Sequence, residues 1–200
     1  MMRRALQAAV LVGALVLTSG CAVINHAGAA ATVGDARYSE EQLASDVARL
    51  DKALGTQAKP ATQDAINRNL ITIWIGDQIM QKAVAANHLV ENKVAIGKLH
   101  RMLVNQVGGA GALDAFVASR GVAPNMVWMV LRNSVYTTDL GAKLIGGTNT
   151  TAQDAAAGAY LTKLAGTMSI DVAPRFGTWD GAKMAAVADA ANLSKAASAG

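Results

Sequence analysis

Few side chains in this sequence of 200 residues have the type and spacing that metal binding or catalysis requires. The histidines His26, His88 and His100 are far apart and lack the spacing of zinc ligands. The single cysteine, Cys21, rules out an internal disulfide. No glycine-rich loop joins a predicted strand to a helix, and no serine lies in a nucleophile motif. We therefore expect no metal, no cofactor and no enzymatic activity.

One carboxylate stands out by its position. Asp77 falls on the apolar face of a helix predicted over residues 62–87. Because buried charges are normally paired, we interpret Asp77 as a structural carboxylate whose partner is an arginine such as Arg101 or Arg132. The alternative is a catalytic acid, which is disfavoured because no second catalytic group accompanies it.

The residues that precede Cys21 resemble a signal sequence and suggest a role for this cysteine. Arg3 and Arg4 precede an apolar run, 5–17, that is too short to cross a bilayer as a finished helix. Small residues then lead directly to Cys21, in a pattern that resembles the lipobox of bacterial lipoproteins. We expect residues 1–20 to be a signal peptide, and Cys21 to carry lipid that anchors the chain to the cell membrane on its extracytoplasmic side. The alternative is an ordinary secretory signal with a chance cysteine.

Composition limits the class of partner. Hydrophobic residues make up 52% of the chain and aromatic residues 4%, and alanine contributes much of the hydrophobic share, which favours helices. The net charge of +4 falls to +2 once Arg3 and Arg4 are removed, and the basic residues do not cluster. A nucleic-acid partner is therefore not expected.

Helical periodicity and capping residues predict a mainly α fold. Ser39 and Gln42 form a capping box, Gly108 and Gly121 are placed to end helices, and Pro124 is placed to begin one. Thr151 begins a second sequence that resembles a capping box. The predicted helices cover residues 40–54, 62–87, 92–107, a short segment ending before Gly121, 124–145 and 151–165.

The two ends of this helical region read as extended. Residues 31–38 contain a turn at Gly34 and Asp35, and residues 168–172 alternate apolar and polar side chains. We expect these two segments to pair and to close a single domain over 33–180. Residues 21–32 are then a tether and residues 181–200 a flexible alanine-rich tail. We interpret 175–180 as a strand-end aromatic anchor, with a recognition tip as the alternative.

The predicted helix 124–145 has only a thin polar stripe. We expect its apolar side to form a groove that binds polypeptide, because methionine is flexible and is frequent on adaptable binding surfaces. Each methionine taken singly is more often a core residue. The candidate binding residues are Met126, Trp128, Met129, Leu131 and Val135.

Taken in order, several segments resemble the N-terminal chaperone domain of SurA-like proteins, in a lipoprotein form without the prolyl-isomerase module. The matching segments are Ala31–Asp35, Tyr38–Leu43, Gly108–Gly109, Ala112–Leu113, Gly121–Pro124, Arg132 and Val172–Asp180. The family places a serine or threonine where this chain has Ala123.

The resemblance implies a helical domain whose terminal strands pair and which binds unfolded or exported polypeptides through an apolar surface. A second hypothesis is an envelope scaffold or adaptor lipoprotein with one dedicated protein partner. The sequence leaves the oligomeric state and the identity of any client open.

Overall fold

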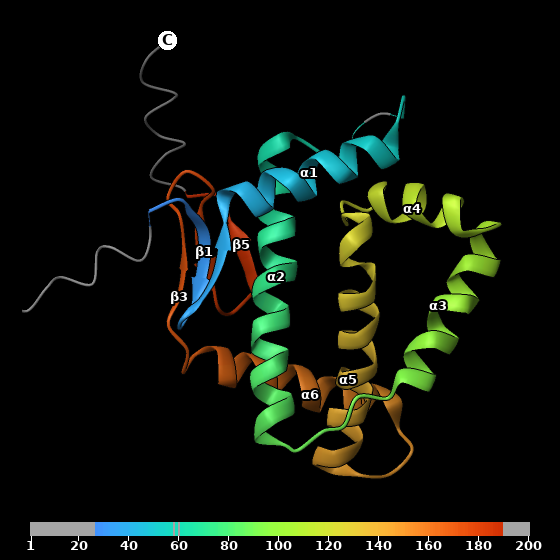
Figure 1. Cartoon of the computed structure of the whole chain (residues 1–200). Helices are drawn as coiled ribbons and strands as arrows, with labels where there is room; N and C mark the ends of the chain where they lie inside the picture. The colour runs from blue at the N-terminus through green and yellow to red at the C-terminus, as the bar shows by residue number, and fades with distance from the viewer. Residues whose placement is uncertain (1–26, 58, 60, 190–200) are drawn as a thin grey trace, which may run out of the picture.

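The computed structural model describes residues 27–57, 59 and 61–189, and this part of the chain is mainly helical, as predicted (Figure 1). The signal peptide and Cys21 lie outside the described residues. The helices are α1 (Glu40–Leu54), α2 (Gln63–Ala86), α3 (Lys93–Val107), α4 (Ala110–Ala118), the 3₁₀ turn η2 (Pro124–Met126), α5 (Val127–Ile145) and α6 (Thr150–Ala165). The strands are β1 (Ala29–Val33), β2 (Ala36–Ser39), β3 (Ile170–Val172), β4 (Thr178–Asp180) and β5 (Ala185–Val187).

The predicted pairing of the two extended segments is confirmed. Strand β1 lies between β2 and β3 in an antiparallel sheet, with Thr32 opposite Asp171. Gly34 has a φ of +54°, which suits the tight turn between β1 and β2. Every residue of β1 is buried, so the expectation that the tether extends to residue 32 is wrong: backbone pairing on both edges holds Ala29–Thr32 in the domain.

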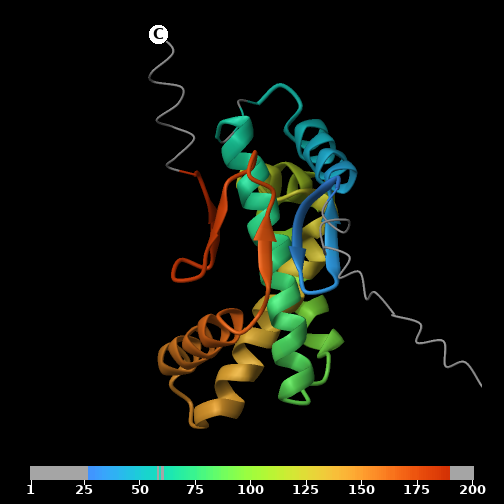
Figure 2. The same cartoon turned by 90° about the vertical axis from the view of Figure 1, so that its left-hand side faces the viewer.

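The expectation of a flexible tail from residue 181 onward is also wrong for Ala185–Val187, which form a strand. Strand β5 pairs with β4, and its Ala186 N–H donates to Thr72 Oγ1 on α2 at 2.9 Å. Alanine-rich sequence has little strand propensity, so this strand depends on the neighbours that complete its hydrogen bonds. Trp179 of β4 packs on the main core, which supports the aromatic-anchor interpretation. Figure 2 shows both small sheets beside α2.

Helix α2 is the centre of the molecule. Its fully buried Leu70, Ile71 and Ile75 lie in the main core, where they meet α1, the sheets and the start of α5. The predicted capping box of α1 is present: Ser39 Oγ accepts from Gln42 N–H, and Gln42 Oε1 accepts from Ser39 N–H.

The short α4 is a corner between two long helices. Gly108 ends α3 in the left-handed conformation, and Gly121 ends the α4 corner at a φ of +75°. The Val122 N–H donates back to the Val117 carbonyl, and the Gly121 N–H to the Ala118 carbonyl, which is the paired bonding of a Schellman motif. Pro124 then begins a 3₁₀ turn, and the α-helical part starts at Val127.

Helix α6 crosses α5 closely. A Cβ atom on Gly141 of α5 would lie 2.4 Å from the carbonyl oxygen of Gln153, so only glycine allows this approach. Asn149, rather than the predicted Thr151, caps α6: its side chain accepts from the Ala152 N–H. The cap falls two residues earlier because the helical hydrogen bonds already begin at Asn149, whose carbonyl accepts from the Gln153 N–H.

Candidate functional site

A pocket of about 360 Å³ lies between α1, α2 and the start of α5. We call it the α1 pocket. Its lining residues are Tyr38, Gln42, Ser45, Asp46, Arg49, Trp74, Asn125, Met126 and Met129. Three of them, Trp74, Met126 and Met129, supply an apolar wall, and the others are polar or charged. Two of the predicted binding residues, Met126 and Met129, therefore line a pocket.

A buried carboxylate organises the α1 pocket. Asp46 is 8% exposed, and Tyr38 is 2% exposed. The Tyr38 hydroxyl donates to Asp46 Oδ2 at 2.5 Å, and the Asn125 amide donates to Asp46 Oδ1 at 2.7 Å. Burial and then the hydrogen bond to Asp46 raise the pKa of the Tyr38 hydroxyl well above its ordinary value. The tyrosine ring also stacks on Trp74, with the ring centres 5.4 Å apart.

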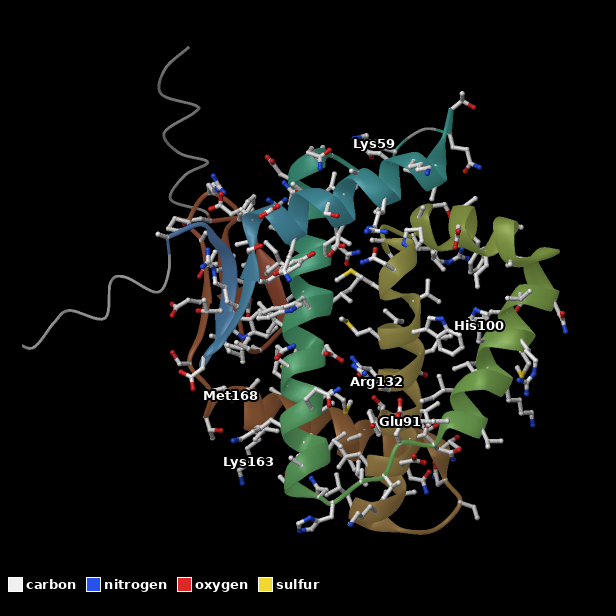
Figure 3. All side chains as sticks on the ribbon, viewed as in Figure 1. Lys59, Glu91, His100, Arg132, Lys163 and Met168 are labelled. Carbon is white, nitrogen blue, oxygen red and sulfur yellow. The ribbon has the colours of Figure 1, made fainter. Side chains whose placement is uncertain are left out.

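The interpretation of Asp77 as a paired structural carboxylate is confirmed, and the partner is Arg132. The guanidinium Nη2 donates to Asp77 Oδ1 at 2.7 Å, and the two side chains are 31% and 7% exposed respectively. Figure 3 shows Arg132 pointing from α5 towards α2. The other candidate, Arg101, is exposed on α3.

An apolar cluster between α3, α4 and α5 is half covered in the sense that fewer than half of its members are fully buried. We call it the α3–α5 cluster. Five of its members are buried: Ile96, Leu113, Val117, Val127 and Leu131. Seven more are only partly buried: Leu99, Leu103, Val104, Val107, Phe116, Val122 and Val135. Most of this cluster therefore retains contact with solvent, unlike the main core around α2.

Trp128 lies beside this cluster and is 53% exposed. Its ring stacks on His100 of α3, with the ring centres 4.4 Å apart. Figure 3 shows His100 pointing from α3 towards α5. An aromatic pair that bridges two helices while facing water is a surface that another apolar side chain can cover.

The five predicted binding residues therefore separate onto two sides of α5. Leu131 and Val135 belong to the α3–α5 cluster, with Trp128 beside it, whereas Met126 and Met129 line the α1 pocket. Met126 and Leu131 are buried, which corrects the expectation that both present an open groove. Helix periodicity places all five on the apolar side of α5, but α2 and α3 each cover part of that side.

Sequence reasoning missed Tyr38, Asp46 and Trp74. Asp46 had a usable signal, because it lies between Leu43 and Leu50 on the apolar face of α1, as Asp77 does on α2. Its partners Tyr38 and Asn125 lie 8 and 79 residues away, and no local pattern identifies them.

The described part of the chain contains no group of three or more His, Cys, Asp or Glu side chains placed to bind a metal ion. None of the helices within it has the length and apolar character needed to cross a membrane. No protein-family model, curated protein or solved structure matches this chain.

Proposed function

We propose that this chain is a chaperone-like lipoprotein, anchored through Cys21 to the extracytoplasmic side of the cell membrane, that binds unfolded or exported polypeptides. The observation that carries the proposal is the half-covered α3–α5 cluster with Trp128 and His100 beside it. Non-native polypeptides expose the apolar side chains that such a surface can cover.

The weak attachment of α3 supports the same function. Ile96 is the only buried residue of this helix, whereas α2 has eight buried residues. A helix with few buried contacts opens at low free-energy cost, so α3 can move away from α5 and expose more of the cluster to a client.

An aggregation assay with a denatured client tests the proposal. The full chain should suppress aggregation at a few-fold molar excess, and Trp128→Ala should lose most of that effect. Met102→Ala is the matched control, because Met102 of α3 is 55% exposed, close to the 53% of Trp128, but takes no part in the ring pair between Trp128 and His100. Absence of suppression by the full chain, or equal losses in both variants, contradicts the proposal. A single specific complex without a general client effect would support the scaffold alternative.

Anchoring needs a separate experiment because Cys21 lies outside the described residues. Cys21→Ala should release the protein from the membrane fraction, since lipid attachment supplies the apolar chains that hold it there. Retention of Cys21→Ala at the level of the unsubstituted protein would contradict lipidation at this residue and would leave the client-binding proposal standing.

A further inference from the structure

The α1 pocket contains a carboxylate, Asp46, that is already held by hydrogen bonds within the protein. Each oxygen of Asp46 accepts a hydrogen bond from within the protein, from Tyr38 or from Asn125. These bonds make Asp46 a fixed part of the wall, because releasing it for a ligand would leave the buried Tyr38 hydroxyl unpaired.

Other donors that line the pocket are, in contrast, unused. Within the described residues, Arg49 makes no hydrogen bond or ion pair, and the indole N–H of Trp74 has no hydrogen-bond acceptor. The amide nitrogen of Gln42 is also without an acceptor there, since only its oxygen serves the capping box. The lining therefore offers an anion both a full positive charge and neutral N–H groups.

A second pocket of about 350 Å³ adjoins this one and shares Arg49 and Asn125 with it. It adds Lys52, another cation without an ion pair in the described residues, and Asp114. The charged groups that face the two pockets are thus Arg49, Lys52, Asp46 and Asp114, of which Asp46 already accepts two hydrogen bonds.

The opposite wall of the α1 pocket selects an apolar group. Trp74, Met126 and Met129 surround a space of about 360 Å³, which is at the small end of ligand pockets and suits one or two residues of a peptide. Methionine side chains adapt to apolar groups of different shape, so this wall accepts aliphatic and aromatic side chains alike.

We propose that the α1 pocket binds the carboxyl-terminal residue of a polypeptide that ends in an apolar side chain. The terminal carboxylate pairs with Arg49, and the side chain lies against Trp74, Met126 and Met129. This site is separate from the α3–α5 cluster, so the proposal does not rest on client binding at that cluster.

Fluorescence anisotropy with short labelled peptides tests the proposal on the full chain held in nanodiscs of neutral lipid. One peptide ends in Leu-Phe with a free carboxylate, and its partner is identical except for a carboxyl-terminal amide. We expect the free acid to bind about tenfold more tightly, because one charge-assisted contact is lost in the amide.

Substitutions test whether the difference in affinity between the acid and the amide arises in the α1 pocket. Arg49→Gln should remove the preference for the free acid, and Met129→Ala should weaken both peptides equally. Arg101→Gln, on the exposed surface of α3, is the matched control and should change neither affinity. Equal binding of acid and amide, or an unchanged preference in Arg49→Gln, would overturn the proposal. Octanoate provides the same carboxylate on an acyl chain, and direct binding of octanoate, measured by calorimetry, without any peptide binding would overturn the polypeptide assignment.

Discussion

Two buried carboxylates, Asp46 and Asp77, hold helices together in different ways. Asp46 joins α1 to the strand β2 and to the 3₁₀ turn η2 through neutral donors, whereas Asp77 joins α2 to α5 through the cation of Arg132. Both interrupt the apolar face of their helix, and each costs free energy of desolvation that its partners must offset. We therefore expect them to specify how these helices are placed more than to add stability.

Removing Arg132 should reveal the free-energy cost of burying the Asp77 carboxylate. Arg132→Leu leaves a buried carboxylate without its charged partner, and we expect it to lower the free energy of unfolding by about 2–4 kcal/mol, since Arg132 is partly exposed. Lys59→Ala is the control, because its ion pair with Asp51 is exposed and should contribute less than about 1 kcal/mol. Urea denaturation measures the free energy of unfolding of both variants. Equal losses would show that the Asp77–Arg132 pair contributes no more than an exposed ion pair.

The hydroxyl of Tyr38 should give stability a dependence on alkaline pH. Its folded-state pKa is raised above the ordinary value of about 10, so the native state keeps this proton where the unfolded chain loses it. The resulting stabilisation is complete below about pH 10 and is lost as the pH rises through the folded pKa.

Tyr38→Phe isolates this contribution. The variant should lose about 1.5–3 kcal/mol at neutral pH, because a hydrogen bond to a charged group disappears. The difference from the unsubstituted chain should become smaller between about pH 9 and pH 11, as the unfolded tyrosine ionises. Urea denaturation over this range provides the measurement, and a constant difference would contradict the raised pKa.

At the scale of elements, the approach of α6 to α5 depends on one residue. Gly141 allows the backbone of α6 at Gln153 to lie against α5, and Gln153 is buried there. The Gln153 amide also donates to the carbonyl oxygens of Gly146 and Gly147, which stabilises the turn between the two helices. The position of α6 in turn fixes where the chain enters β3.

Gly141→Ala should therefore destabilise the fold, although alanine favours helices. The added methyl group would overlap the backbone of Gln153, and overpacking of this kind costs about 1–3 kcal/mol. Gly158→Ala, inside α6 with open space around it, should instead stabilise by about 0.5–1 kcal/mol. Thermal unfolding of the two variants checks the opposite signs, and a stabilised Gly141→Ala would mean that the helices separate easily.

The whole molecule combines a well-buried centre with a lightly attached arm. The main core joins α1, α2 and the sheets and includes Ala118 of α4, which also packs against α1, whereas the arm, α3, contacts the remainder chiefly through α4 and α5 (Figure 1). Because the α3–α5 cluster is half covered, the free energy that holds the arm in place is smaller than that of the core.

Native-state hydrogen exchange should separate these two parts. Backbone amides in the middle of α3 should exchange at least about tenfold faster than those in the middle of α2, because local opening of α3 exposes little buried surface. Mass spectrometry of peptides from each helix measures the rates. Equal protection of the α3 and α2 amides would mean that α3 unfolds only with the whole domain. The client-binding proposal could then not include a movement of α3 away from α5.

Sequence determined the features that arise within a few residues of one another. Helix periodicity, the Ser39 capping box, the glycine corner and the alternation in 168–172 each depend on local hydrogen bonding or side-chain spacing. The burial of Asp77 and its need for an arginine also follow from its position in one helix. The pairing of residues 31–38 with residues 168–172 was predictable because two short extended segments stood alone in a helical chain.

Tertiary structure decided what depends on which elements approach one another. It selected Arg132 over Arg101, made a strand of Ala185–Val187, and assembled Tyr38, Asp46 and Asn125 from three elements. It also divided the apolar side of α5 between a pocket and a half-covered cluster. Local sequence patterns cannot predict these features, because each depends on the packing of side chains that are distant in sequence.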